Sequence, residues 1–420
     1  MLLGVIADDL TGATDVALML SREGMRVVQT VGVPEQGKPL PQADAVVVSM
    51  KSRTNPAEEA VAWSLQACEA LLAAGARQIL FKYCSTFDST DQGNIGPVAD
   101  ALMQRLGSRL TIACPAFPEN GRSVYLGHLF VGEMLLSDSP MKDHPLTPMR
   151  DSSLVRVLQR QTKTPVKLLR QQTVAQGSKA VRDQLQALAQ DGPVMVVADA
   201  ISNQDLRVLG EAMADEKLLT GGSGIALGLP DNFRRSGLLG PRSATSLFDA
   251  PKGPAVILSG SCSAATNGQV AYAQAQGVPS LGLDPLAIAD NKQSVTTVLD
   301  WAKAQRQDAP FMIFSTAAPE SIKQVQERLG RERSGALIEH LLADVARHLF
   351  DAGVRRFVVA GGETSGAVVQ GLGVSMLEIG PEIDPGVPWT RAADGKPIAL
   401  ALKSGNFGTP DFFLKALAML

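Results

Sequence analysis

Short apolar runs alternate with longer amphipathic segments along most of the chain. A run of about four to eight residues that is apolar almost throughout is typical of a strand buried in a parallel sheet, whereas apolar residues spaced three and four apart predict a helix. In the first half, this pattern predicts strands at residues 2–7, 26–31, 45–49, 78–82, 110–113 and 194–198. It predicts helices at residues 14–23, 56–74, 95–106 and 174–190.

The same alternation begins again near residue 255. Residues 220–254 are rich in Gly and Pro and irregular, which places a domain boundary at residues 240–253. We therefore predict an α/β fold of two α/β domains, residues 1–240 and 253–420, each with a mainly parallel sheet flanked by helices. The cleft between them is the expected active site. The second half has predicted strands at residues 255–258, 280–283, 311–315, 357–360, 375–379 and 398–403, and predicted helices at 264–275 and 334–352.

The composition of the 420 residues is that of a folded protein, with 45% hydrophobic and 19% charged residues. The 39 Lys and Arg residues against 42 Asp and Glu give a net charge of −3, which argues against an electrostatic grip on nucleic acid. The 4 cysteines lack CxxC spacing and indicate reduced thiols. The apolar start lacks a basic segment, and the longest uncharged stretch, residues 253–283, is too polar to span a membrane. We expect a soluble, cytoplasmic protein.

Candidate chemistry lies just after the strands of the first half, because ligands of open α/β sheets bind beyond the carboxyl ends of the strands. Asp8, Asp9 and Thr11 follow the first strand and suit a polyol, a general base or a hydrated Mg²⁺ ion. Alternatively, Asp9 or Thr11 only caps the next helix. Lys51 and Arg53 follow the third strand and could clamp a carboxylate or phosphate, unless they lie in a solvated loop.

The fourth predicted strand ends in a lysine, Lys82, and a dense group of hydroxyl and carboxylate side chains follows it. Ser85 and Asp88 are the candidates within this group. A cation beside hydroxyls fits an anionic, hydroxylated substrate. We therefore predict Asp8 and Asp9 as catalytic residues, and the substrate-binding set is Arg53, Lys82, Lys51, Ser85 and Asp88. The sequence assigns no metal ligands.

Three strand exits in the second half are rich in Gly and Ser, at Ser259–Ser263, Gly361–Gly366 and Lys403–Gly408. Any tight strand-to-helix turn favours these residues, but three on one sheet edge can surround a polyphosphate with backbone N–H groups and helix N-termini. We expect a side chain at Gly362 to block the phosphates or to force a backbone angle that only glycine adopts freely. GxxxxGK[ST] and GxGxxG are absent, which disfavours a P-loop NTPase, a protein kinase and a dinucleotide fold.

Together these motifs resemble the four-carbon acid sugar kinase family. The resemblance covers nearly the whole chain, with ADDLTGA, KSRT, KYCSTFDST, GNIGP, GGETSG and KSGNFG in the family's order. It implies an N-terminal acid-sugar-binding domain and a C-terminal ATP-binding domain, with ATP and Mg²⁺ as cofactors. It also implies that ATP is contacted by Ser259, Gly361, Gly362, Glu363, Thr364 and Gly405.

Within the family, KYCSTFDST is most similar to the branch that acts on 3-oxo-tetronate. The implied reaction is phosphorylation of the C4 hydroxyl of 3-oxo-tetronate. A D-threonate or D-erythronate kinase is the near alternative, and a non-catalytic sensor of sugar acids or nucleotides is the alternative from another class. The expected partners are a small acid sugar and ATP, without nucleic acid or membrane, and the sequence leaves a homo-oligomer open.

Overall fold

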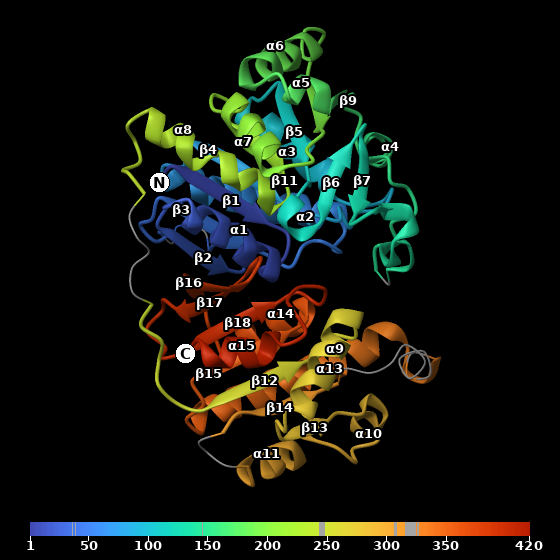
Figure 1. The fold of residues 1–420 in the computed structure, drawn as a ribbon, viewed down its shortest axis with the longest axis vertical. Helices are drawn as coiled ribbons and strands as arrows, with labels where there is room; N and C mark the ends of the chain where they lie inside the picture. The colour runs from blue at the N-terminus through green and yellow to red at the C-terminus, as the bar shows by residue number, and fades with distance from the viewer. Residues whose placement is uncertain are drawn as a thin grey trace. The chain divides into compact units, whose positions relative to one another are not determined.

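The computed structural model describes residues 1–35, 37, 39–144, 146–242, 248–305, 309–315, 325 and 327–420. The chain divides into two compact units, Met1–Ser246 and Leu247–Leu420 (Figure 1). The boundary predicted at residues 240–253 includes residues 243–247, which lie outside the described residues.

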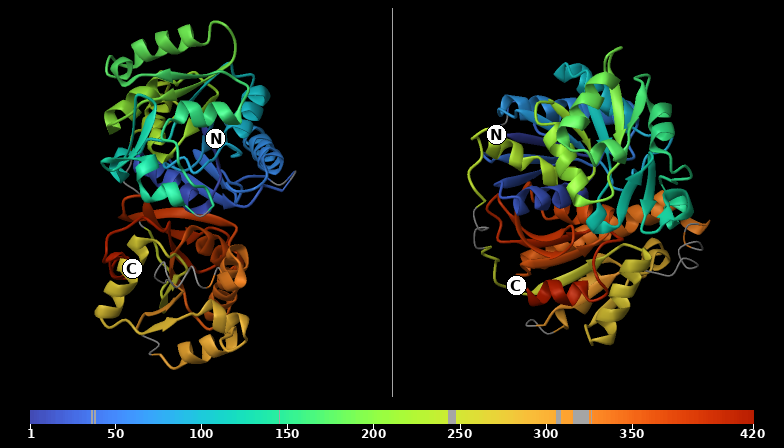
Figure 2. Two further views of the ribbon diagram at one scale, coloured as in Figure 1. Left: turned by 90° about the vertical axis from the view of Figure 1, so that its right-hand side faces the viewer. Right: turned by 45° about the horizontal axis from the view of Figure 1, so that its top comes forward.

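The first unit is built on a parallel sheet, as the apolar runs predict. Most of its strands are buried along their whole length, because helices flank the sheet (Figure 2). Every pairing in it is parallel. In sheet order, the strands are β2 (Val27–Val31), β3 (Ala45–Ser49), β1 (Leu3–Ala7), β4 (Gln78–Lys82), β11 (Leu218–Gly221), β5 (Leu110–Cys114), β10 (Val194–Ala198) and β9 (Val166–Leu169).

The ends of the central strands form one row at the edge of this sheet. Ala7 lies opposite both Ser49 and Lys82, and Lys82 lies opposite Gly221. Gly221 ends β11, which overlaps the start of the stretch predicted to be irregular, residues 220–254. The prediction is therefore wrong for the first residues of that stretch. The strand is only 4 residues long and runs into consecutive glycines, which gives it the appearance of a loop.

Two helices of the first unit differ from the prediction. Helix α1 begins at Leu10 rather than at residue 14, because Asp9 caps it. The helix predicted at 174–190 is divided in two by Gly177, whose φ of 98° ends the first part. The helices are α1 (Leu10–Arg22), α2 (Ala57–Ala73), α3 (Ile95–Leu106), α4 (Leu154–Gln161), α5 (Gln171–Val174), α6 (Ser178–Leu188), α7 (Asn203–Ala212) and α8 (Pro230–Arg235).

A small antiparallel sheet follows β5 and is absent from the prediction. Its first two strands join at Leu126 and Gly127, whose φ values of 49° and 73° form a tight turn. The buried carboxylate of Asp199, after β10, accepts hydrogen bonds from both of their N–H groups, each at 2.8 Å. The strands are β6 (Arg122–Tyr125), β7 (His128–Val131) and β8 (Met134–Leu135). Short 3₁₀ turns complete this unit at Pro118–Asn120, Leu136–Asp138, Pro140–Asp143 and Ser223–Gly228.

The second unit has a mixed sheet of seven described strands. In sheet order, the first five strands pair in parallel, and the sixth pairs antiparallel with the strand on either side of it. The pattern does not predict β17, and it predicts only part of β16. Both contain a proline, Pro381 and Pro388, which interrupts the apolar run. In sheet order, the strands are β13 (Ser280–Gly282), β14 (Phe311–Phe314), β12 (Ala255–Ser259), β15 (Arg356–Ala360), β18 (Ala399–Lys403), β17 (Val387–Ala392) and β16 (Met376–Asp384).

Aromatic side chains anchor the last helix of the second unit. Trp389, Phe412 and Phe413 are almost fully buried, and the Trp389 indole N–H donates to the Ala416 carbonyl at 3.0 Å. The indole thus buries a large apolar area while its polar group stays paired. The described helices are α9 (Ala264–Ala275), α10 (Pro285–Ala289), α11 (Val295–Lys303), α13 (Arg331–Asp351), α14 (Gly362–Gly371) and α15 (Phe412–Ala418).

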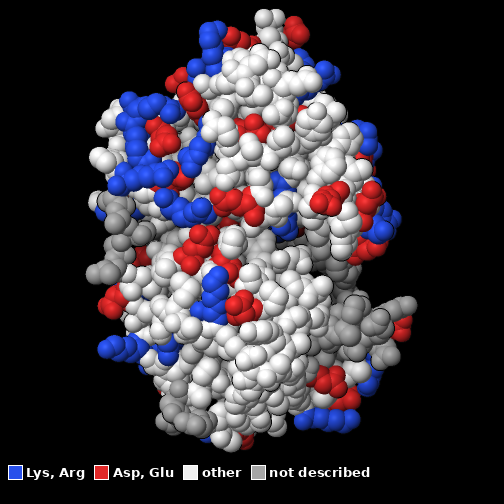
Figure 3. Space-filling model, viewed as in Figure 1, with Lys and Arg blue, Asp and Glu red and all other residues white. Residues whose placement is uncertain are grey.

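Basic side chains gather on the surface over α8 (Figure 3). They are paired with acidic groups: the buried carboxylate of Glu23 binds Arg207 and Arg242, and Asp231 binds Arg234 at 2.7 Å. This cluster therefore stabilises the fold around the end of α1. In the part of the chain that the structure describes, no helix has the length and apolar character that crossing a membrane requires.

Candidate active site

The turn after β1 brings Asp9 into two roles. Its carboxylate caps α1, accepting from the Gly12 N–H at 3.2 Å and from the Thr11 hydroxyl at 2.8 Å. It also contacts Arg53, so Asp9 both caps α1 and lies beside another predicted site residue. A Cβ atom at Gly12 would lie 2.7 Å from the Lys82 Nζ and even closer to the Asp9 carboxylate. Glycine is needed here because the turn packs so tightly against the site.

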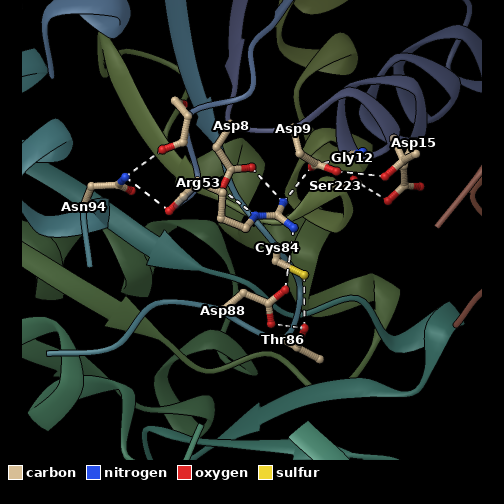
Figure 4. Close-up of polar contacts among 12 residues, drawn as sticks. Asp8, Asp9, Gly12, Asp15, Arg53, Cys84, Thr86, Asp88, Asn94 and Ser223 are labelled. Atoms are coloured by element: carbon tan, nitrogen blue, oxygen red, sulfur yellow. Dashed lines mark hydrogen bonds and ion pairs between the residues drawn. The ribbon is translucent and has the colours of Figure 1, made fainter. Parts of the chain in front are cut away.

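Arg53 joins three carboxylates, two from the turn after β1 and one from the loop after β4 (Figure 4). Its Nε and Nη2 donate to the two oxygens of Asp8 at 2.9 and 2.8 Å, a bidentate pair. Nη2 also donates to Asp9 Oδ1 at 2.6 Å, and Nη1 lies 3.6 Å from Asp88 Oδ2. The structure thus brings together four of the predicted site residues, and most donors of the guanidinium are used within the protein.

Asn94 fixes the loop that carries Arg53, and the predicted site does not include it. Its side-chain amide donates to the carbonyls of Ser52, Arg53 and Asn55 at 2.8, 3.2 and 3.3 Å. The amide is buried, so these bonds fix the backbone of the loop (Figure 4). The sequence signal was the GNIGP segment, in which an asparagine precedes α3 without capping it.

Lys82 presents a buried ammonium to the same site. Its side chain is only 2% exposed, and no hydrogen bond or ion pair joins it to any residue that the structure describes. It lies close enough to Asp9 to lower the pKa of that carboxyl. Of the other predicted residues, Ser85 is buried in the loop after β4, whereas Lys51 is exposed on the loop after β3. Lys82 therefore differs from Arg53, whose guanidinium is paired within the protein.

The loop after β4 is held in an uncommon backbone conformation. Phe87 and Asp88 have φ values of 66° and 48°, which residues other than glycine adopt at a cost of about 1–3 kcal/mol each. The Thr86 hydroxyl donates to Asp88 Oδ1 at 2.7 Å and lies 3.0 Å from the Cys84 sulfur. Burial raises the pKa of the Cys84 thiol to about 12, so it is neutral. The strain and these contacts aim the second Asp88 oxygen at Arg53.

The two adjacent carboxylates after β1 differ in acidity. Burial raises the pKa of Asp8 despite its pairing with Arg53. Burial also acts to raise the pKa of Asp9, but Arg53, Lys82 and the capping hydrogen bonds outweigh it and lower that pKa. Three carboxylates share two cations here, so the negative charge is not fully balanced and the more deeply buried Asp8 holds a proton more readily.

The three glycine-rich turns of the second unit meet at one edge of its sheet. Ser259, Ala360 and Lys403 lie opposite one another on adjacent parallel strands, so the turns begin side by side. A Cβ atom at Gly361 would lie 3.2 Å from the Ser261 backbone nitrogen, and one at Gly405 would lie 2.6 Å from the Ser261 hydroxyl. These approaches show that the turns pack directly against one another, as the strand pattern predicts.

The structure changes the argument about Gly362. Helix α14 begins at Gly362, and the left-handed backbone lies one residue earlier, at Gly361, whose φ is 120°. The prediction that Gly362 needs a backbone angle that only glycine adopts freely is therefore wrong, because the positive φ belongs to Gly361. Glu363 and Thr364 lie in the first turn of this helix, and Thr364 is buried.

Three further residues connect the turns and are absent from the predicted site. The Gly405 carbonyl accepts from the hydroxyls of Ser263 at 2.5 Å and Thr266 at 2.8 Å, and from the Lys403 ammonium at 3.0 Å. Thr266 and Ser263 belong to the start of α9, so these bonds join α9 to the turn after β18. The available signal was a lysine that ends an apolar strand, the same signal that identified Lys82.

No set of three or more His, Cys, Asp or Glu side chains could hold a metal ion among the residues that the structure describes. Mg²⁺ in nucleotide enzymes is held by one or two carboxylates together with the phosphates and water. The described residues therefore do not assign ligands to a Mg²⁺ ion.

Comparison with known families defines the class of protein. Residues 3–229 match the family described as a sugar-binding N-terminal domain, and residues 256–413 match the one described as a nucleotide-binding C-terminal domain. The chain is thus a two-domain protein for a sugar and a nucleotide. It belongs to the four-carbon acid sugar kinase family, which confirms the resemblance carried by the motifs.

The relatives match over their whole length. A 3-oxo-tetronate kinase from Cupriavidus necator is 58% identical, covering 100% of this chain and 97% of the relative. A 3-oxo-tetronate kinase from Burkholderia multivorans is 57% identical with the same coverage. A crystal structure from Salmonella typhimurium LT2, of a protein provisionally described as a tRNA synthase, is 42% identical with a TM-score of 0.86, covering 100% of this chain and 99% of that one.

Proposed function

We propose that this protein transfers the γ-phosphoryl group of ATP to the C4 hydroxyl of 3-oxo-tetronate, giving 3-oxo-tetronate 4-phosphate. The observation that carries the proposal is the 58% identity over the whole chain to a 3-oxo-tetronate kinase. The two sets of strand ends support it. One presents buried cations and carboxylates suited to a hydroxylated acid, and the other presents glycine-rich turns suited to a polyphosphate.

In this proposal, residues 1–240 bind the acid sugar. Lys82 receives the substrate carboxylate, since its buried ammonium has no hydrogen-bond partner among the described residues. Arg53 contributes through Nη1, the nitrogen that makes only a long contact of 3.6 Å to Asp88. Lys51 and Ser85 lie on the two adjoining loops and add contacts to the substrate. Asp88 orients Arg53 toward it.

The carboxylate pair after β1 handles the proton of the C4 hydroxyl. Asp9, or Asp8 beside it, accepts or orients this proton as the oxygen attacks phosphorus. The pKa of Asp8 is raised and that of Asp9 is lowered, and Arg53 contacts both carboxylates and holds them in place. The reaction needs positioning and charge neutralisation more than covalent chemistry.

Residues 253–420 bind ATP in this proposal. The contacts come from the N–H groups and hydroxyls of the three turns, and Mg²⁺, when bound with ATP, neutralises part of the phosphate charge. Gly361 and Gly405 have no side chain that would push the adjoining turns apart, so the three turns stay close together around the phosphates. The proposed nucleotide-binding residues are Ser259, Gly361, Gly362, Glu363, Thr364 and Gly405.

A coupled assay of ADP release over a panel of four-carbon acids tests the proposal. With 3-oxo-tetronate we expect the largest kcat/KM, and ³¹P NMR should show a phosphate monoester on C4. A higher kcat/KM with D-threonate or D-erythronate would reassign the substrate within the family. Binding of both ligands without ADP formation would instead support a sensor.

A further inference from the structure

Lys403 ends β18 with a fully buried ammonium. The ammonium donates three hydrogen bonds, to the Thr266 hydroxyl at 3.0 Å and to the carbonyls of Ser404 and Gly405 at 2.9 and 3.0 Å. All three acceptors are neutral, and no ion pair joins Lys403 to any described residue. A buried charge without a counter-ion is costly, so the absence of a carboxylate here needs an explanation.

The charged side chains on neighbouring elements are engaged elsewhere. On the antiparallel side, Arg391 of β17 pairs with Glu378, and Asp384 of β16 pairs with Lys415. Glu363, in the first turn of α14, makes no contribution to the pKa of Lys403. Burial lowers that pKa to about 7, with no charged neighbour opposing it.

The location of this ammonium indicates what its missing counter-charge is. The backbone of Lys403 accepts from the Gly361 N–H at 2.8 Å, and its side chain reaches Thr266 on α9. Lys403 therefore lies where all three glycine-rich turns join. A polyphosphate bound by these turns would bring several negative charges close to the buried ammonium of Lys403.

We propose that nucleotide binding in the second unit is coupled to uptake of a proton by Lys403, which acts as a positioning residue for the turn after β18. The free site holds a mixture of amine and ammonium near neutral pH. The phosphates stabilise the ammonium, so the amine takes one proton from solvent as the nucleotide binds. Only the ammonium has three N–H donors, and only it can hold Thr266, Ser404 and Gly405 together.

This inference rests on the nucleotide site proposed above but not on phosphoryl transfer. The test is therefore a binding measurement. ADP is titrated into the protein by calorimetry from pH 6.5 to 9, in pairs of buffers that differ in ionisation enthalpy, which counts the protons taken up. ADP's own ionisation is common to every variant and cancels when variants are compared.

The wild type should take up close to one more proton than Lys403→Met at about pH 8, and its ADP affinity should fall up to about tenfold per pH unit above 7. Lys403→Met, which has neither charge nor proton, should bind ADP at least about tenfold more weakly at pH 6.5 and lose this pH dependence. Lys403→Arg keeps a fixed charge and should also lose the pH dependence while retaining more affinity than Lys403→Met. The matched control is Lys303→Met on α11, whose side chain is 75% exposed, and it should titrate like the wild type.

Equal proton uptake by wild type and Lys403→Met would overturn the proposal and leave Lys403 a structural tie. If thermal melts show that the Lys403 variants do not fold, the test uses the wild type only. In that case, an ADP affinity that stays constant between pH 7 and 9 would overturn the proposal. A protein that shows the coupling but phosphorylates no four-carbon acid would reject the proposed kinase activity and leave this inference standing.

Discussion

Adding one methyl group at Gly361 should weaken nucleotide binding through the backbone alone. The φ of Gly361 is 120°, and an added Cβ would lie 3.0 Å from the Thr364 hydroxyl and 3.2 Å from the Ser261 N–H nitrogen. A non-glycine residue in such a backbone region costs about 1–3 kcal/mol. The Gly361→Ala turn should relax to relieve this strain, and ATP must then restore the binding conformation. We expect the Kd for ATP to rise by roughly 5- to 150-fold.

Gly366→Ala is the matched control for this substitution. Gly366 lies in the same helix, α14, its φ is not positive, and an added Cβ meets no heavy atom within 4 Å. The same methyl group there should leave the Kd for ATP unchanged and should stabilise the protein slightly, because alanine favours helix over glycine by about 1 kcal/mol.

The assay is calorimetric titration of ATP into both variants, with a thermal melt of each and a titration of the acid sugar without nucleotide. Acid-sugar affinity should match the wild type in both, because that ligand is assigned to the other unit. If folded Gly361→Ala binds ATP as tightly as Gly366→Ala, the turn does not contact the nucleotide. Ser259 and Gly405 would then be the remaining candidates.

Three other outcomes follow from the charges. Asp9→Asn should lower kcat by about two to four orders of magnitude and leave the ATP affinity unchanged, since asparagine still caps α1 through Gly12. If kcat in steady-state kinetics falls less than about fivefold, Asp9 serves only as the cap of α1. Arg53→Ala should raise the KM for the acid by about tens-fold, and Arg53→Lys should recover only part of this loss. In thermal melts, Arg53→Ala should be less stable than the wild type, and the difference should grow from pH 4 to 7 as the unpaired carboxylates ionise. The unfolding free energy of the wild type, measured relative to Lys403→Met, should rise from pH 7 toward pH 10, because the unfolded wild type binds more protons than the folded protein across that window.

The parts of this protein that follow from the hydrophobic pattern were predictable, and the parts that depend on side-chain pairing were not. Strand ends align in a parallel sheet, so Asp8 and Lys82, and likewise Ser259 and Gly405, could be placed together from the sequence. The pattern could not show that Arg53 pairs with three carboxylates, because Arg53, the Asp8–Asp9 pair and Asp88 lie on three separate loops. It also missed short or proline-containing strands, whose apolar runs are too brief to stand out.

The position of β11 has a consequence for how the first unit is made. This strand lies between β4 and β5 in the sheet. The ribosome has made both neighbours once it reaches Cys114, whereas β11 itself is Leu218–Gly221. A ribosome adding about 5–20 residues per second takes on the order of 5–20 s to reach it. During that interval, the strand that ends in Lys82 has one exposed edge, and direct pairing of β4 with β5 competes as a misfolded arrangement. A Cβ at Gly221 would clash with the Cys114 carbonyl, so the late strand must also enter a narrow gap. Translation speed across residues 115–217 and chaperone supply should therefore affect the yield of native protein more strongly than they affect its final stability.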